Sequence, residues 1–257
     1  MTGSSWCSVS RAESDIVAEA ARVLEAARAD GVPIRLMGGL AVYFHTEDIP
    51  VALQRSYDDI DVAAARSASR SAAELFTKLG YEPSKEFNAL QGRRRLLFHD
   101  RANDRKLDVF VGSFEMCHTI PITGRMELDD RTIPLAELLL TKLQVFELTH
   151  KDLNDITTLL NGHDVGDADG ETINGDFVAK LTADDWGLWR TVKMNLERVR
   201  EQIDSLSLDS ASRARVLERA EAVWERIERE PKSRRWRVRD RVGDRKRWYE
   251  VPDEVRR

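Results

Sequence analysis

The feature of this sequence that most restricts its fold is a change of pattern near residue 133. Before that point, short apolar runs with the alternation of strands lie between segments with helical spacing, whereas only helical spacing follows it. Alternating helices and strands predict a small mixed sheet with helices packed on it. We therefore predict an α+β fold, with a sheet-containing catalytic domain in residues 1–130, a helical domain in residues 131–230 and a basic tail in residues 231–257.

The expected elements of the first part run helix, strand, helix, strand, helix, strand, strand. Their expected ranges are 11–30, 33–37, 40–44, 59–63, 67–79, 94–98 and 106–111. In the second part we expect two helical pieces in 134–161, a polar loop at 162–175 and two or three helices in 176–229. The end of the chain, 236–251, is predicted to be either a basic hairpin turning at Gly243 or a disordered arm.

Composition excludes several classes of protein. No apolar run approaches the ~20 residues that a membrane span needs, and residues 1–11 lack the pattern of a signal peptide. Cys7 and Cys117 are the only cysteines, too few for a disulfide framework, so we expect a cytoplasmic protein. The net charge of −5 is uneven, because residues 231–257 carry eleven Lys/Arg and five Asp/Glu. Any polyanionic partner is expected to meet this basic segment.

Two adjacent glycines, Gly38 and Gly39, lie between a predicted strand and a predicted helix. Without side chains, they let the backbone approach a phosphate closely. The helix that follows offers unpaired N–H groups and the positive end of its dipole. This position is therefore a candidate phosphate site.

Three aspartates form a candidate metal site. Asp59 and Asp61 are two residues apart on a predicted strand, so both side chains leave the same face. Neighbouring carboxylates repel one another, and a bound Mg²⁺ is the usual way to stabilise them. Asp108 lies on a later strand. If the two strands pair, the three carboxylates converge and can hold two metal ions.

These residues resemble the nucleotidyltransferase superfamily that includes DNA polymerase beta and the aminoglycoside nucleotidyltransferases. Within it the chain is most similar to the AbiEii-like and MenT-like toxins of bacteria. The resemblance covers roughly residues 30–160. It rests on Gly38-Gly39, Arg55, Asp59-Ile60-Asp61-Val62, Asp108, Leu138 to Gln144 and Lys151 to Ile156. The gap from Gly39 to Asp59 is longer than usual in this family, which predicts an insertion around residues 46–54, and Tyr57 stands where the branch often has threonine.

The resemblance implies Mg²⁺-dependent transfer of a nucleoside monophosphate from an NTP to an acceptor. Two Mg²⁺ ions would be held by Asp59, Asp61 and Asp108, with Asp108 receiving the acceptor proton. Gly38 and Gly39 would cradle the phosphates. The toxin branch further implies a tRNA acceptor and an antitoxin protein as partner.

The same resemblance implies that Lys142, Asp152 and Asp155 complete the nucleotide site, with Lys142 neutralising the triphosphate. The alternative for Lys142 is a lysine whose stem covers the core, and the alternative for Asp152 is a plain helix-start role. Asp152 and Asp155 lie ten and thirteen residues after Lys142, so one straight helix would not bring them to it. The chain must turn near residues 149–151.

Other charged residues keep two interpretations. Arg55 either pairs with Asp58 or meets a phosphate. Arg93 to Arg95 are either a charged edge strand or a contact to nucleotide or RNA, and the five histidines are interpreted as structural or exposed.

The acceptor is the least certain part of the expected function. Arginines interleaved with Trp236, Trp248 and Tyr249 suit RNA, because guanidinium groups pair with phosphates and rings stack on unpaired bases. The alternatives are an antibiotic-type nucleotidyltransferase with a small-molecule acceptor, and a non-catalytic module that binds nucleotide or RNA.

Overall fold

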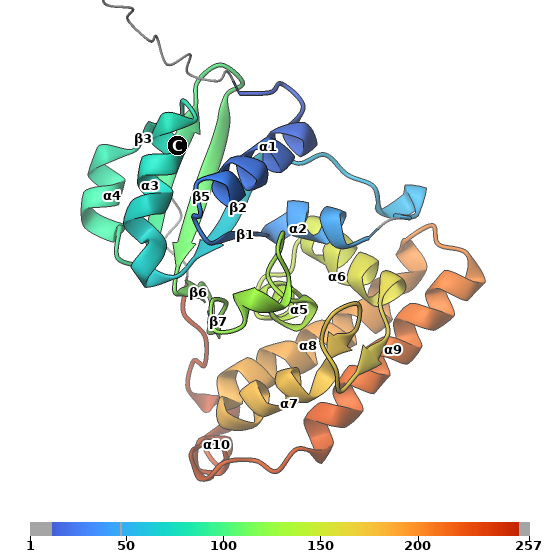
Figure 1. The fold of residues 1–257 in the computed structure, drawn as a ribbon. Coiled ribbons are helices and arrows are strands. Elements are labelled where there is room, and N and C mark those ends of the chain that lie inside the picture. The colour runs from blue at the N-terminus through green and yellow to red at the C-terminus, as the bar shows by residue number, and fades with distance from the viewer. Residues whose placement is uncertain (1–11, 47, 252–257) are drawn as a thin grey trace, which may run out of the picture.

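The computed structural model describes residues 12–46 and 48–251, and it is a mixed α and β structure that is 54% helical with a small mixed sheet (Figure 1). This bears out the coarse prediction from the sequence. The sheet has five strands in the order β1-β2-β5-β4-β3. Their bounds are Ile34–Met37 for β1, Asp59–Ala64 for β2, Glu82–Pro83 for β3, Arg95–Asp100 for β4 and Arg105–Val111 for β5.

The centre of the sheet is a parallel pair, β2 and β5, flanked by antiparallel neighbours. Since β2 and β5 run parallel, the chain must cross over between them, and it does so through α3, β3, α4 and β4. Figure 1 shows the helices α1, α3 and α4 in the upper part of the view with the sheet. These helices span Ile16–Ala29, Ser69–Lys78 and Lys85–Gln91, and the short α2 spans Gly38–His45.

The first-half elements lie close to their expected places, but one helix and three strands are absent from the prediction. They are the seven-residue α4, the two-residue β3 and the paired three-residue strands β6 (Ser113–Glu115) and β7 (Thr119–Pro121), none of which is long enough to show a period. The helix α1 begins where the Asp15 carboxylate accepts a hydrogen bond from the Ala18 N–H, and it is followed by Gly31 at φ 65°.

A second group of helices follows and occupies the lower part of Figure 1. They are α5 (Leu135–Leu143), α6 (His150–Gly162), α7 (Gly175–Asp184), α8 (Trp186–Gln202) and α9 (Ser210–Arg229). The prediction that only helices follow residue 133 is wrong in one detail, because the polar loop contains two paired two-residue strands, β8 (Val165–Gly166) and β9 (Ile173–Asn174).

One hydrophobic cluster of buried side chains includes residues from Ala20 to Ile227. It joins the sheet and the helices on either side of residue 130. The division into a catalytic and a helical domain stays a prediction.

The C-terminal segment is neither a hairpin nor a disordered arm over residues 234–251. It forms the helix α10 (Arg234–Asp240) and a 3₁₀ turn at Gly243–Arg245. The hairpin prediction failed because Ser233 caps the helix, accepting from the Trp236 N–H, and Trp236 is buried. In the part of the chain that the structure describes, no helix is long and apolar enough to cross a membrane.

Candidate functional site

The strands β2 and β5 pair in parallel and bring two of the three aspartates side by side, as the sequence argument requires. Asp61 is the direct partner of Asp108 in the register, and Asp59 is the partner of Lys106. Asp108 is buried at 4% exposure, Asp61 is partly buried, and Asp59 is exposed.

The surroundings of Asp61 disfavour the ionised form of its carboxyl group. Burial, followed by repulsion from the Asp108 carboxylate, raises the pKa of Asp61 to about 7, although the nearby Lys142 ammonium acts in the opposite direction. Asp108 is compensated differently, because its Oδ1 accepts a hydrogen bond of 2.8 Å from Arg95 Nε. The Arg95 guanidinium also lies 5.0 Å from the centre of the Phe110 ring. The carboxylate pair therefore already has cations on two sides.

The fit to a metal is partial. Carboxylate oxygens are the ligands that Mg²⁺ prefers, and the in-register pair of Asp61 and Asp108 needs a positive charge between or beside its members. Within residues 12–46 and 48–251, however, no group of three or more His, Cys, Asp or Glu side chains is arranged to hold a metal ion. The strand register thus brings Asp61 beside Asp108. Among the described residues, however, the three aspartate side chains do not come together as the metal site that the resemblance implies.

The two glycines stand at the start of α2, directly against this site. Gly38 has a φ of 66°, and a Cβ placed on it would collide with the Asp61 carboxylate. A Cβ on Gly39 would collide with the Arg55 guanidinium. No side chain caps the N-terminus of α2. Backbone conformation and close approach to Asp61 therefore both favour glycine at position 38, whereas at position 39 only the close approach of the Arg55 side chain does.

A second charged cluster lies around Asp155, which is buried at 3% exposure. Arg55 donates two hydrogen bonds to its carboxylate, of 2.9 and 2.8 Å, and Lys142 Nζ lies 2.8 Å from Asp155 Oδ2. Burial alone would raise the pKa of Asp155, but the Lys142 ammonium and the Arg55 guanidinium outweigh it and hold the pKa below its usual value.

The turn that the sequence argument requires is present and joins this cluster. The helix α5 ends at Leu143 and α6 begins at His150, so the bend lies just before the residues where it was expected. Thr149 and Asp152 form a capping box at the start of α6, which bears out the helix-start role for Asp152. Its second oxygen still faces the cluster, 3.8 Å from Lys142 Nζ.

Several remaining interpretations can now be compared with the structure. Arg55 pairs with Asp155, a partner that the sequence had not suggested, whereas Asp58 pairs with Lys151 at 2.8 Å. Arg95 is the residue whose role was missed, since its ion pair with Asp108 crosses between neighbouring strands. Three consecutive arginines lead into β4, but the sequence alone does not show that β4 lies beside the strand of Asp108.

The histidines that the sequence left as structural are confirmed as such at three positions. His45 contacts Thr132 and Ile133, His118 contacts Thr191, and His163 contacts the backbone of Glu171.

The chain has been compared with known families and proteins. No family model matches it, and no curated protein is significantly similar to it. The class of protein to which it belongs must therefore be argued from the residues and geometry above.

Proposed function

We propose that this chain is a nucleotidyltransferase that moves a nucleoside monophosphate from an NTP to an acceptor. The observation that carries the proposal is the in-register pair Asp61 and Asp108 beside the uncapped start of α2. Two glycines there leave room against Asp61. A helix start of this kind binds phosphate, and paired strand carboxylates suit a divalent cation.

The roles of the residues follow from their places. Gly38 and Gly39 would cradle phosphate oxygens with backbone N–H groups, and Lys142 would neutralise the triphosphate after exchanging its contact with Asp155. Before that exchange Asp155, itself held by Arg55, would position Lys142, with Asp152 as a second carboxylate beside the ammonium. Asp108 would receive the acceptor proton, which requires its ion pair with Arg95 to open.

Asp59, Asp61 and Asp108 are the residues that would hold Mg²⁺. When bound, the ions would supply positive charge to the triphosphate and lower the pKa of the acceptor hydroxyl. Binding the ions through Asp108 would require this carboxylate to be released from its ion pair with Arg95. Phosphoryl-type transfer depends mainly on such positioning and charge compensation.

For the acceptor we propose RNA, with tRNA as the candidate and a toxin role with a partner antitoxin. The support is the basic C-terminal segment, residues 231–257, which carries eleven Lys/Arg and five Asp/Glu in a chain whose net charge is −5. A small-molecule acceptor would need no such surface.

A second candidate is a non-catalytic nucleotide-binding module. It is favoured by the charge compensation inside the site, since Asp108 and Asp155 both have cationic partners and the described residues form no three-carboxylate group. Such a protein would bind NTP without incorporating it.

One experiment separates these functions. The full chain is incubated with each labelled NTP and Mg²⁺, once with total tRNA and once with an aminoglycoside, in parallel with EDTA and with an Asp61→Asn variant. Label on RNA that needs both Mg²⁺ and Asp61 supports the proposal. Retention of NTP without labelling favours the binding module, and label on an aminoglycoside but not on RNA favours the small-molecule acceptor.

A further inference from the structure

We propose that the C-terminal segment forms a preformed site for an unpaired nucleotide of an RNA strand, in a hollow between α10 and the start of α8. This deepens the proposed function and rests on it for the choice of RNA. The hollow has a volume of about 580 Å³, within the usual range for a ligand site. It lies among the later helices and the C-terminal turn, away from the carboxylate pair on β2 and β5.

Aromatic rings form much of the wall. Trp186, Trp236, Trp248 and Tyr249 all line the hollow. Tyr249 stacks on Phe146 with ring centres 3.7 Å apart and an angle of 10° between the planes. This stacked pair of rings is present before any ligand binds. Aromatic faces of this kind bind unpaired bases, because every base offers a π face.

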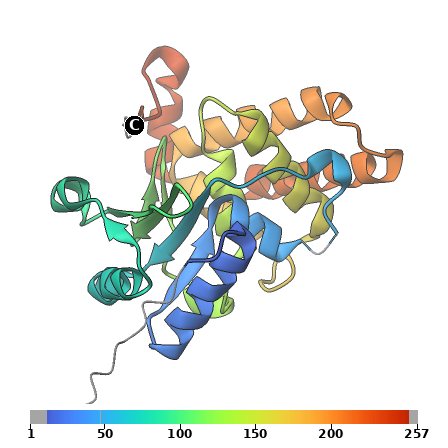
Figure 2. The ribbon, with the colours of Figure 1, turned by 90° about the horizontal axis from the view of Figure 1, so that it is seen from above.

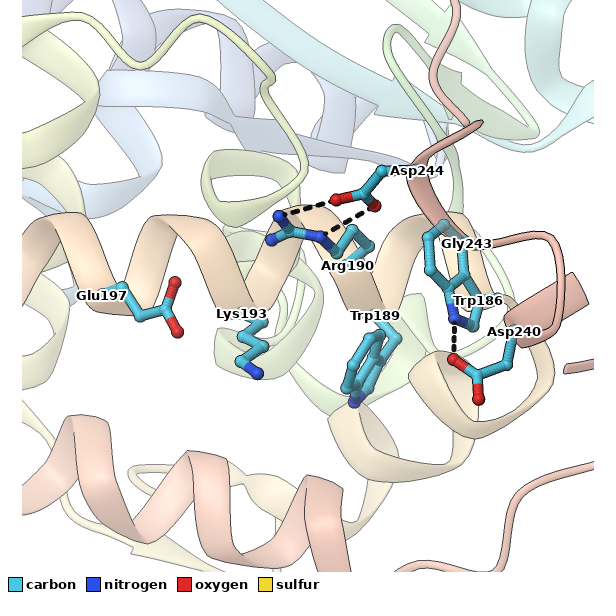
Figure 3. A pocket seen from close by; sticks show the side chains of 8 residues that line it. All are labelled: Trp186, Trp189, Arg190, Lys193, Glu197, Asp240, Gly243 and Asp244. Carbon is cyan, nitrogen blue, oxygen red and sulfur yellow. Dashed lines mark hydrogen bonds and ion pairs between the residues drawn. The ribbon is translucent and has the colours of Figure 1, made fainter. Parts of the chain in front are cut away.

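The rings are held rigidly. On the adjoining face of α8, Trp186 Nε1 donates a hydrogen bond of 2.7 Å to Asp240, and Arg190 pairs with Asp244 of the following turn (Figure 3). The Arg239 guanidinium lies 4.5 Å from the centre of the Trp186 ring and donates to the carbonyls of Gly243 and Lys246. The turn after α10 is therefore tied to α8, and the hollow does not need to form on binding.

Trp236 provides an independent indication of a ligand. It lines the hollow at 8% exposure, and its Nε1 is a buried donor for which the described part of the chain supplies no acceptor. A buried donor without an acceptor costs free energy, so such groups usually meet water or a ligand. A base carbonyl or ring nitrogen would satisfy it only if the Trp236 ring turns toward the hollow, because the Nε1 atom is covered as it lies.

The charges fit a nucleotide. Arg235, Lys246 and Arg247 line the hollow with exposed side chains, which can reach phosphate oxygens. The carboxylates Asp184 and Glu250 line it too. They can accept hydrogen bonds from base amino groups or from a 2′-hydroxyl, the group that distinguishes RNA from DNA.

A duplex would not fit this arrangement, because its bases are stacked on one another and cannot enter a hollow lined by rings. The site therefore calls for a single-stranded loop or end.

The test measures binding of a fluorescent single-stranded RNA to the full chain by anisotropy, in EDTA and without NTP. Two double variants remove the same charge from the same segment. Arg235→Gln with Arg247→Gln changes residues that line the hollow, and Arg237→Gln with Arg245→Gln changes exposed arginines that do not. We expect the first pair to weaken binding about tenfold and to reduce the salt slope by about 1.4, and the second pair to change both little.

Two further measurements test the base. Trp236→Phe keeps a ring and removes the donor, and at a temperature where circular dichroism shows the variant to be folded it should weaken RNA binding several-fold. An abasic oligonucleotide of equal length should bind more weakly than the RNA. Free AMP or UMP should compete only at far higher concentration than the RNA, and competition at equal concentration would assign the hollow to a free nucleotide instead.

The proposal is overturned if wild type binds no RNA, if both double variants lose affinity equally, or if the abasic strand binds as well. Failure of the proposed function is separate, since Asp61→Asn should bind this RNA normally while losing all transfer. If wild type binds RNA but transfers no nucleotide, the RNA-binding site is supported and the proposed nucleotidyltransferase function is rejected.

Discussion

Two buried carboxylates are already committed to cations before any substrate arrives. Asp108 pairs with Arg95, and Asp155 pairs with both Lys142 and Arg55. Breaking a buried pair costs several kcal/mol unless the freed charges find new partners. A triphosphate supplies such a partner for Lys142. We therefore expect the triphosphate to replace the Asp155 carboxylate as the anion that pairs with the Lys142 ammonium.

Asp61→Asn is expected to abolish nucleotide transfer without lowering the thermal stability of the protein. Burial and the neighbouring Asp108 carboxylate both disfavour the negative charge of Asp61. Because the asparagine removes that charge, the unfolding free energy should be unchanged or higher. Transfer rates and a thermal melt at pH 8 are the measurements. Activity above a few per cent of wild type would reject Asp61 as an essential residue.

Lys142→Met is expected to lower kcat/KM by about 100-fold or more, because the charge facing the triphosphate is lost. The methionine keeps the apolar stem, and Arg55 still neutralises Asp155, so the unfolding free energy should fall by only about 1–3 kcal/mol. Steady-state kinetics beside urea unfolding measure both quantities. The double variant with Asp155→Asn should recover stability but not turnover, whereas normal turnover in Lys142→Met would make this lysine purely structural.

At the level of elements, the start of α2 is where backbone and side chains constrain each other most. Gly38 and Gly31 offer a matched comparison, since their φ values are 66° and 65°. A Cβ on Gly31 meets nothing within 4 Å, whereas a Cβ on Gly38 collides with Asp61. Gly31→Ala should therefore cost only the backbone strain, about 1–2 kcal/mol.

Gly38→Ala should cost more than Gly31→Ala and should also displace Asp61, so that transfer is lost. Urea unfolding of the two variants, together with transfer assays, makes the comparison. Equal stability losses and equal activity would show that Gly38 serves only the turn.

The elements near the candidate site were the ones that the sequence could predict. Alternation and glycine positions located β1, α2, β2 and β5, and the spacing from Lys142 to Asp155 required the bend between α5 and α6. The hairpin at the C-terminus failed for a physical reason. Arginine at every second position from residue 237 to residue 241 resembles one face of a strand, but burial of Trp236 against other rings outweighs the local pattern. Ion pairs such as Arg95 with Asp108 depend on which strands become neighbours, and no local pattern encodes that.

Across the whole molecule, His118 links several distant segments and should make stability depend on pH. Its side chain contacts Thr191 of α8, and burial lowers its pKa to about 4. The folded pKa thus lies below the unfolded value of about 6.5, so the unfolded state binds the proton first. The contribution of His118 to stability is full above pH 6.5 and is lost as the pH falls toward 4, by an amount on the order of 3 kcal/mol.

Urea unfolding between pH 7.5 and pH 4.5 measures this loss, with His118→Gln as the comparison. The difference in unfolding free energy between wild type and variant isolates His118, because the other groups that titrate in this range are common to both. These are His45 and His163, whose pKa values burial also lowers, and Asp61, whose raised pKa of about 7 gives a slope of the opposite sign. The unfolding free energy of the variant should therefore fall less toward low pH, and parallel profiles would mean that the pKa of His118 is the same in the folded and unfolded states.

The C-terminal segment packs against the rest of the molecule as well as carrying charge, so its removal should lower the stability of the protein. Trp236 lies 5.1 Å from Trp189 between ring centres, and Trp248 Nε1 donates to Thr191 Oγ1 at 3.1 Å. The backbone of Glu250 also donates to the Cys117 carbonyl at 3.0 Å, which ties the segment to the loop between β6 (Ser113–Glu115) and β7 (Thr119–Pro121).

Truncation after Pro231 is therefore expected to expose Trp186 and Trp189 and to cost at least about 3 kcal/mol, comparable with deleting a buried tryptophan. RNA binding should weaken too, but a truncated chain that is partly unfolded cannot assign that loss to charge. The substitutions of Arg235 and Arg247 can, because both side chains are exposed. The measurement is urea unfolding of the truncated and full chains, followed by intrinsic tryptophan emission. Equal midpoints and equal emission maxima would show that the segment contributes no packing, and would make truncation a clean test of its charge.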